Sequence, residues 1–573
     1  MTREQLKQQQ KEERHQCLQA ILNSTSKKKV IVAGAGTGKT FTFGQVLKQR
    51  EGGNNLAMTF IRKLIADMET KLGSHAEVKT FHAYCKKVLH AQNGKVEIAP
   101  FLTKLIEKDA ELLANNLSHF DAKFQTLDEA SPQIAFHLKR GDYYEAVGFD
   151  DSVYRLYKML QRDSDILPAF DQIVIDEFQD FHQLEVAFIH ELSKKGDILI
   201  VGDDDQAVYD GRNASPIHLR NVHQMADFEK FELPFCSRCP QAIVNATNRI
   251  IQCAQQKGHF KNRIPKKYEC FLDDKEADSI KYPKVILANC TTAAVVAKYV
   301  HSEILKIDPL DIAESNAEGN EYPTVLIVGT KQYLQAVDKH FKKTGVLFDY
   351  TPSDEISYGI VEAYEWLLRN AKSNLGWRIL AELFFDEAEQ KRLVKDSETG
   401  VEMTKLLDSK FVADHLRAIK LVRALRNKEQ ELAGVQDKLK AILGAHYDEV
   451  ASYFPPKEDE ESADIDKAKP TILLTSFLGC KGLSAGHVFI IGVHNGSMPK
   501  NAATITDVEI SQFIVALTRT RKQCHIVSDR WLVAPVDKNG KFIPAFQKSA
   551  FVSWIPTELI EDKGKISAKD LPK

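Results

Sequence analysis

The sequence predicts an α/β protein with two cores, each built on a parallel sheet and each interrupted by a helical insertion. Short apolar strands alternate with helical patterns, an arrangement that gives parallel sheets. Several strands end in glycine or acidic residues, and the active residues of such sheets gather at the carboxyl ends of the strands. The alternation starts again near Leu233, which indicates a second core. A chain of 573 residues is also too long for one hydrophobic core.

Composition favours a globular protein without membrane spans or an export signal. The hydrophobic content of 43% and the charged content of 27% are ordinary. No apolar run approaches the roughly 18–20 residues that cross a bilayer, and the first residues lack the apolar core of a signal peptide. We therefore expect an intracellular, cytoplasmic protein with no membrane partner. Nine cysteines predict free thiols, and a net charge of −2 means that nucleic-acid binding requires a local basic face.

The first core opens on a phosphate-binding loop. Residues 30–32 predict a buried strand and residues 41–49 predict the helix that follows. The loop between them consists of Ala33, Gly34, Ala35, Gly36, Thr37, Gly38, Lys39 and Thr40. In such a loop backbone amides cradle phosphates, the lysine reaches the outer phosphates and the threonine hydroxyl reaches Mg²⁺. Ala33 replaces the first glycine of the standard pattern and is small enough to be tolerated.

Two further strands of the first core end in acidic residues. The strand at 172–175 leads into Asp176 and Glu177, where the aspartate would bind the metal and the glutamate would orient and deprotonate water. The strand at 198–201 leads into three aspartates and a glutamine at 203–206. A calcium loop is disfavoured there, because its oxygen ligands spread over about 12 residues and end in glutamate. The phosphate loop and the acidic pair together predict nucleoside triphosphate hydrolysis with Mg²⁺.

The expected domain boundaries follow these patterns. Residues 91–168 and 355–456 are mostly helical, with apolar residues at three- and four-residue spacing, and predict the two insertions. The acidic run at 457–470 predicts a solvated linker, and 561–573 predicts a polar tail. The remaining segments belong to the first core (1–90 and 169–230) and to the second core (231–354 and 471–560).

Six or seven motifs, in order between residues 16 and 521, resemble those of the UvrD/Rep-type superfamily 1 helicases. Besides the two phosphate motifs, the matching segments are 58–63, 80–82, 476–483 and 515–521. The resemblance implies two RecA-like P-loop cores that hydrolyse ATP with Mg²⁺. It also implies movement along single-stranded DNA, 3′ to 5′, up to duplex junctions.

The resemblance further implies roles around the nucleotide. Glu177 would be the general base and Gln206 would sense the terminal phosphate. Arg238 and Arg519 would reach over from the second core to stabilise the transferring phosphoryl group, unless they are ordinary surface arginines. The remaining implied nucleotide and metal contacts are the loop residues Lys39 and Thr40, the metal ligand Asp176, the adenine reader Gln16 (with Gln19 as a rival), and Gly482.

The implied DNA contacts come from the first core. They are Thr59, Phe60, Arg62, Thr80, His82 and Tyr209. Stacking of bases on aromatic side chains carries no sequence preference, which suits a protein that moves along a strand. Packing in the core is the competing interpretation for Phe60 and Tyr209.

The chain departs from the family pattern at three positions. Gly211 stands where the family has a base-stacking tryptophan, Ser237 where an aromatic stacks on adenine, and Ser484 where an acidic residue meets the ribose. The hydrolytic residues are intact, so the departures bear on adenine selectivity and strand separation. Three hypotheses follow: a strand-separating motor, a DNA-stimulated ATPase without processive unwinding, or an ATP-gated subunit beside a nuclease.

One cysteine pair has the spacing of half a zinc site. Cys236 and Cys239 are separated by two residues, but Cys253 and Cys270 stand alone and no second close pair completes the site. Zinc is therefore disfavoured.

Overall fold

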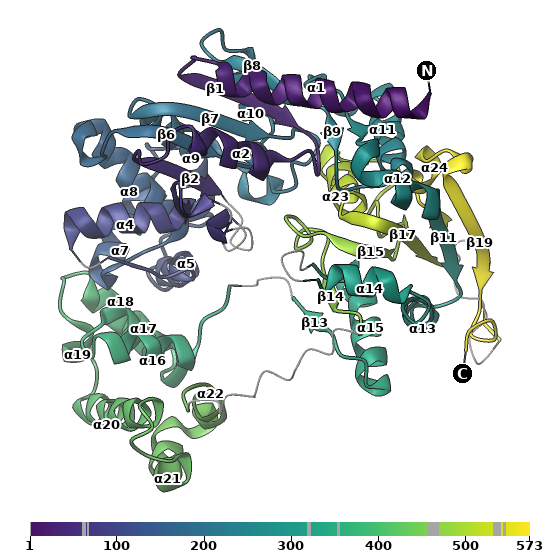
Figure 1. Ribbon diagram of the computed structural model, residues 1–573. Coiled ribbons are helices and arrows are strands. Elements are labelled where there is room, and N and C mark those ends of the chain that lie inside the picture. Colours follow the sequence, from purple (N-terminus) through teal and green to yellow (C-terminus); the bar gives the residue numbers. More distant parts are fainter. Residues whose placement is uncertain are drawn as a thin grey trace.

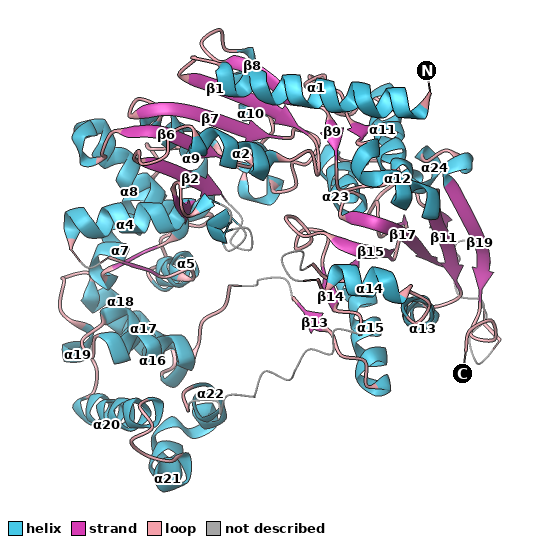
Figure 2. Ribbon diagram, in the orientation of Figure 1, coloured by secondary structure: helices cyan, strands magenta, loops and turns pink. Residues whose placement is uncertain are grey.

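A computed structural model of the chain describes residues 2–59, 65, 68–70, 72–94, 96–317, 322–351, 356–455, 469–530, 540–541 and 546–572. Two parallel sheets lie side by side, with helices on both faces of each (Figures 1 and 2). The two-core α/β prediction is confirmed. In the described residues no helix is long and apolar enough to cross a membrane.

The first sheet has six parallel strands in the order β3-β2-β6-β7-β1-β8. The strands are β1 (Lys28–Ala33), β2 (Asn55–Thr59), β3 (Glu77–Thr80), β6 (Phe170–Ile175), β7 (Gly196–Gly202) and β8 (Glu229–Leu233). The helices around it are α2 (Lys39–Lys48), α4 (Phe81–Asn93), α9 (Gln183–Leu192) and α10 (Ile217–Gln224). Val30 and Val32 of β1 belong to one buried hydrophobic cluster, and Ile31 belongs to another. Side chains on opposite faces of the sheet are therefore both buried.

The second sheet has seven parallel strands in the order β13-β14-β12-β15-β17-β11-β19. The strands are β11 (Val285–Cys290), β12 (Val325–Gly329), β13 (Asp349–Tyr350), β14 (Ile472–Thr475), β15 (Ala485–Ile491), β17 (Thr520–Asp529) and β19 (Ile560–Ile566). Its helices include α11 (Gln241–Gln256), α12 (Leu272–Lys281), α13 (Ala293–Ile304), α14 (Pro309–Ser315), α15 (Lys331–Thr344), α23 (Asp507–Leu517) and α24 (Ala550–Trp554).

Two expected boundaries are wrong. The expected polar tail at 561–573 contains most of β19, which pairs in parallel with β11 at the edge of the second sheet. The segment reads as polar because most side chains of this edge strand are exposed, and charged residues on an edge discourage pairing with other chains. The first core extends through β8 to Leu233, so the boundary expected between 230 and 231 falls inside a strand. Residues 457–468, which are most of the expected acidic linker, lie outside the described residues.

The N-terminal helix α1 (Arg3–Asn23) connects the two cores. It runs along the top of both in Figure 1. Ile21 at its end is buried in the first core, whereas Gln10 bonds the backbone of Cys270 and Leu272 in the second. Lys7 and Lys11 form ion pairs with Glu276 and Asp273 of α12. α1 therefore spans the interface between the cores.

The two helical insertions pack on each other and share one hydrophobic core. The first consists of α5 (Leu102–Leu112), α6 (Phe120–Gln125), α7 (Pro132–Tyr144) and α8 (Phe149–Arg162). The second consists of α16 (Ile360–Arg369), α17 (Asn374–Phe384), α18 (Glu387–Ser397), α19 (Met403–Leu406), α20 (Ser409–Arg426), α21 (Leu432–Leu443) and α22 (Tyr447–Tyr453). A single buried cluster draws on both, and Figure 1 shows the second insertion below α5 and α7, on the side of the first sheet.

A buried ion-pair network joins the two insertions. Asp109 of α5 accepts hydrogen bonds from Arg140 of α7 (Nε, 3.0 Å) and from Arg378 of α17 (Nε, 2.9 Å). Tyr144 donates to the same carboxylate at 2.5 Å, and Asp109 and Arg378 are both fully buried. Burial alone would raise the pKa of Asp109, but the two guanidinium groups lower it. The carboxylate is therefore the shared counter-charge of two buried arginines.

Replacing Asp109 by alanine is expected to destabilise this helical unit by about 3–5 kcal/mol, because two buried guanidinium groups lose their counter-charge. Denaturant unfolding followed by tryptophan fluorescence would measure the loss, since Trp366 and Trp377 lie in the shared core. Lys139→Ala is the matched control, because it breaks an exposed ion pair with Glu398 between the same insertions. Its expected cost is below about 1 kcal/mol. Equal costs for the two variants would contradict the assigned role of the network.

Candidate active site between the two cores

The phosphate loop connects β1 to α2 at the edge where the first sheet faces the second core. α2 begins at Lys39, and Gly38 caps it with a φ of 92°, in the left-handed region that favours glycine. Gly36 also has a positive φ, of 70°. The Thr37 hydroxyl donates to the carbonyl of Gly34 at 3.0 Å and holds the turn closed. The free amides at the start of α2 make this end of the helix suited to a phosphate.

Residues of the second core contact the phosphate loop directly. A Cβ at Gly34 would lie 2.6 Å from the Tyr268 ring, and the Tyr268 hydroxyl donates to the carbonyl of Ala35 at 3.1 Å. A Cβ at Gly36 would lie 2.5 Å from the Cβ of Arg238. The amide of Ser237 donates to the carbonyl of Gly36 at 3.0 Å. Glycine at these two positions therefore permits close contact between the cores.

Lys39 faces the acidic pair that follows β6. Its Nζ lies 3.5 Å from Oε1 of Glu177. Burial would lower the pKa of Lys39, but the carboxylates of Glu177 and Asp176 outweigh it and raise the pKa. Burial and the neighbouring Glu177 raise the pKa of Asp176, whereas Lys39 and Lys481 lower the pKa of Glu177 against the effect of burial. Thr40, the other expected metal ligand, is half-buried in the first turn of α2.

Glu177 is held in an unusual conformation by its neighbours. Its φ of 55° lies in the left-handed region, which is costly for a residue with a side chain. The Gln179 amide donates to Oε2 of Glu177 at 2.5 Å, and its own oxygen accepts from the backbone amide of Asp203 at 2.9 Å. Gln179 thus connects the two acidic motifs, a function that the sequence did not indicate.

Arginine side chains of the second core reach this site. Nη2 of Arg519 donates to Oε1 of Gln206 at 3.1 Å, and Gln206 in turn donates to Asp203 at 2.5 Å. Arg519 is buried, and burial together with nearby Arg238 lowers its pKa to about 10, so it is charged at neutral pH. Arg238 donates to the carbonyl of Thr518 at 3.4 Å, one residue from Arg519. The structure therefore brings Glu177, Gln206, Arg238 and Arg519 to one interface.

Two lysines at the interface were not among the predicted site residues. Lys481, next to Gly482 (φ 82°), forms a buried ion pair with Asp180, donates to the carbonyl of Gln206 at 2.7 Å and lies 3.7 Å from Glu177. Lys266, buried and close to Tyr268, lies 2.8 Å from carboxylate oxygens of all three aspartates at 203–205. Lys481 falls within a recognised motif, whereas no local pattern marks Lys266.

A small pocket adjoins the phosphate loop. Its lining is Arg14, Cys17, Leu18, Thr37, Gly38, Phe41, Thr42, Leu233, Pro234 and Phe235. The expected adenine reader Gln16 is exposed on α1 and is not part of this lining, and neither is Gln19. The apolar and aromatic walls suit a flat ring, but the structure gives neither glutamine a contact with it.

The expected DNA contacts are in varied surroundings. Thr59 is buried at the end of β2, and Thr80 caps α4 by accepting from the amide of Ala83. Tyr209 is half-buried with Lys481 over its ring, 5.5 Å from the centroid. Phe60 and Arg62 lie outside the described residues.

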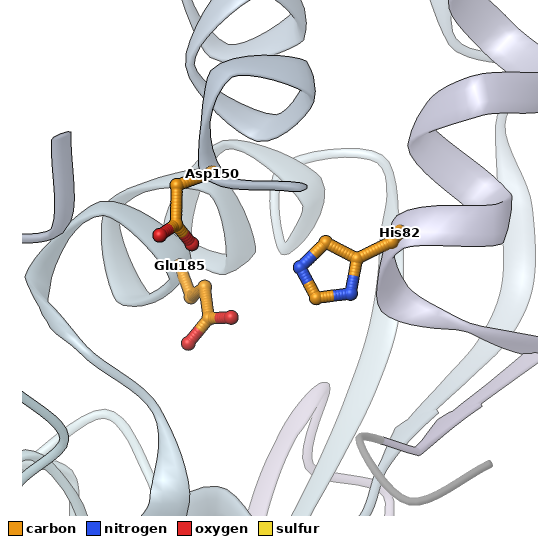
Figure 3. A group of neighbouring side chains, drawn as sticks. All are labelled: His82, Asp150 and Glu185. Atoms are coloured by element: carbon orange, nitrogen blue, oxygen red, sulfur yellow. The ribbon is translucent and has the colours of Figure 1, made fainter. Parts of the chain in front are cut away.

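His82 points toward Asp150 and Glu185 (Figure 3), and the ligand atoms of these three residues lie within 4.8 Å of one another. Arg212 lies 3.6 Å from both carboxylates, and Nε2 of His182 lies 3.1 Å from Asp150. Because Arg212 already supplies the positive charge, this cluster is an ion-pair network that anchors the segment after Gly211.

Comparison with known proteins agrees with this arrangement. A family model described as an AAA domain matches residues 18–212. A "Probable DNA helicase II homolog" of Mycoplasma capricolum is 24% identical, over 89% of this chain and 83% of that protein. An "ATP-dependent DNA helicase PcrA" of Staphylococcus epidermidis is 24% identical over 55% of this chain and 48% of its own length. The "DNA helicase II" of Haemophilus influenzae is 25% identical over 39% of this chain and 38% of its own length.

Two of these three matches span less than half of the relative. The matched region of the family model includes the phosphate loop and both acidic motifs. Two parallel sheets meet at those motifs, as the resemblance implied. The chain is therefore distantly similar to DNA helicase II and PcrA proteins, over most of its length in one match.

Proposed function

We propose that the protein is an ATP-dependent DNA helicase or translocase that moves 3′ to 5′ along single-stranded DNA. The observation that carries the proposal is the hydrogen bond from Arg519 of the second core to Gln206 of the first. A chain of hydrogen bonds through Asp203 and Gln179 connects Gln206 to Glu177. A hydrolytic site divided between two bodies couples each turnover to their relative motion.

The residues present fit ATP and Mg²⁺. The two glycines with positive φ and the start of α2 form a cradle for phosphates, with the Lys39 amine beside it. Thr40 and Asp176 would hold Mg²⁺, which would neutralise charge on the phosphates. The apolar pocket lined by Phe41 and Phe235 would take the base.

Each residue then has a distinct task in hydrolysis. Glu177, kept ionised by Lys39 and Lys481, would accept the proton of the attacking water. Gln206 would orient that water, and Arg519 and Arg238 would stabilise negative charge on the transferring phosphoryl group. Lys481 contacts Asp180, the carbonyl of Gln206 and the ring of Tyr209. It would therefore couple a structural change at the nucleotide to Tyr209, one of the expected DNA contacts.

The proposal is tested by measuring ATP hydrolysis with and without single-stranded DNA, and then displacement from duplexes with 3′ or 5′ tails. Stimulation by DNA and displacement from 3′ tails are expected. Stimulation without displacement would instead support a DNA-stimulated ATPase that does not unwind processively. An ATP hydrolysis rate that does not change with DNA would rule out both the helicase and the DNA-stimulated ATPase. It would leave an ATP-gated subunit, for example of a nuclease complex.

Tryptophan at position 211 is expected to tighten single-stranded DNA binding, because stacking on one base contributes about 1–3 kcal/mol. Gly211 is exposed, has no atom within 4 Å of an added Cβ and adjoins Tyr209 and Arg212. Fluorescence anisotropy with a labelled oligonucleotide would measure the gain. Gly434→Trp is the control, because Gly434 is equally open but lies on α21 of the second insertion. Equal affinities for the two variants would show that position 211 does not face DNA.

A further inference from the structure

Two cysteines flank the Arg238 side chain at the interface between the cores. β9 (Phe235–Cys236) pairs with β10 (Glu269–Cys270), and residues 237–239 then turn into Pro240, which caps α11. Cys236 and Cys239 thus lie on either side of the two residues Ser237 and Arg238. All nine cysteines of the chain are free thiols, as expected.

The Cys236 sulfur lies within hydrogen-bonding distance of the Cys239 backbone. The amide of Cys239 donates to Sγ of Cys236 at 3.3 Å, and both residues are fully buried. The Cys239 thiol lies 3.4 Å from the carbonyl of Thr518, the same carbonyl that Arg238 contacts. Among the described residues, the groups of three or more possible metal ligands do not include these cysteines.

The pKa values of the two thiols are shifted in opposite directions. Burial opposes ionisation of Cys236, but hydrogen bonds from the Cys239 thiol and from the amides of Cys239 and Arg238 lower its pKa to about 6. Burial, together with the neighbouring Cys236 sulfur, raises the pKa of Cys239. The position at the start of α11 also favours negative charge. A nucleophilic cysteine next to a protonated partner is the arrangement found in reactive Cys-x-x-Cys pairs.

We propose that Cys236 and Cys239 form a reversible disulfide that displaces Arg238 from the phosphate loop and thereby stops ATP hydrolysis. The inference rests on the proposed function, because it requires Arg238 to act on the phosphoryl group. In a reducing compartment such disulfides are typically transient and regulatory.

The co-reactant is a peroxide. The Cys236 thiolate attacks one peroxide oxygen, the O–O bond breaks, and the sulfur becomes a sulfenic acid while hydroxide takes up a proton and leaves as water. The Cys239 sulfur then attacks the Cys236 sulfur, the S–S bond forms, the S–O bond breaks and a second water leaves. Two thiols lose two electrons and two protons in total, and the peroxide takes up both.

The link changes the position of Arg238 for a geometric reason. A disulfide requires a sulfur–sulfur distance of about 2.05 Å, so the side chains of Cys236 and Cys239 must move together, and we expect the Ser237–Arg238 turn between them to shift with them. The Cβ of Arg238 lies 2.5 Å from the point where a Cβ of Gly36 would be, and Ser237 bonds the carbonyl of Gly36. A shift of this turn therefore breaks contacts with the phosphate loop. Gly36 also covers Cys236, so a peroxide would reach the sulfur when the cores separate.

The test compares ATP turnover of the full chain before and after treatment with hydrogen peroxide, with peptide mapping of residues 236–239. The wild type is expected to form the link, to lose at least about ten-fold in rate, and to recover with dithiothreitol. Cys236→Ser is expected to show neither the link nor the loss, each variant being compared with its own reduced form. Cys253→Ser, which removes a partly exposed thiol outside the nucleotide pocket, is expected to behave as wild type.

Two results would overturn the inference: no link between Cys236 and Cys239 in the oxidised wild type, or a link that leaves turnover unchanged. Arg238→Ala separates the second result from a failure of the proposed function. If Arg238→Ala abolishes turnover while the link does not, the redox inference alone is wrong. If neither affects turnover, Arg238 does not act on the phosphoryl group and its proposed role fails as well.

Discussion

Arg519→Ala is expected to reduce ATP turnover by about 10³–10⁵-fold, the effect of removing an arginine that stabilises a transferring phosphoryl group. Arg519 is buried and donates to Gln206, Leu483 and Val515, so its guanidinium group is fixed before the reaction. Catalysis by a fixed charge requires no reorganisation during the reaction, which makes its loss costly. Steady-state turnover with saturating DNA would measure the effect.

The control for this experiment is Arg249→Ala, which removes an exposed arginine from α11 of the same core. It is expected to turn over at the wild-type rate. Arg519→Lys keeps the charge but loses the paired donors of the guanidinium group, so its rate should lie between wild type and Arg519→Ala. A rate for Arg519→Ala within a few-fold of wild type would contradict a site shared between the cores.

Lys39→Ala is expected to lower turnover by about 10²–10³-fold or more, because one fixed donor to the phosphates is lost from a buried site. The change also removes the positive charge closest to Glu177 and Asp176, which raises the cost of burying both carboxylates. Nucleotide affinity should fall as well, since the lysine would contact the ground state and the transition state. Turnover and binding of a fluorescent ATP analogue would separate the two effects.

Lys48→Ala is a suitable control for Lys39→Ala, because Lys48 is the exposed last residue of the same helix. It should leave both turnover and binding unchanged. Turnover retained by Lys39→Ala would remove the basis for assigning the phosphate loop.

The sequence predicted what is encoded over short distances. The phosphate loop, the acidic pair and the strands before them were found because strand, loop and helix follow one another within a few residues. The sharing of a core by the two insertions could not be found this way. Periodicity marks Leu102, Leu105 and Ile106 as an apolar face, but it does not say that the second insertion contributes to the same buried cluster.

The same limit applies to the site. Lys266 neutralises three aspartates about 60 residues earlier in the chain, and Tyr268 covers Gly34, so neither has a local signal. Gln16 was predicted from its spacing to Lys39, but this spacing does not tell which side of the helix faces the pocket. The residues of α1 that line the pocket are Arg14, Cys17 and Leu18. Contacts between the cores were therefore predicted only where a known motif already implied them.

The shared core of the insertions also imposes an order on synthesis. The helix α5 ends at Leu112, but the helices that cover its apolar face begin at Ile360. At about 5–20 residues per second, the ribosome needs roughly 10–50 s to supply them. During that time the nascent first core exposes an uncovered apolar surface, the kind of surface that chaperones bind. The second core, interrupted by those same helices, cannot complete its sheet until they have emerged.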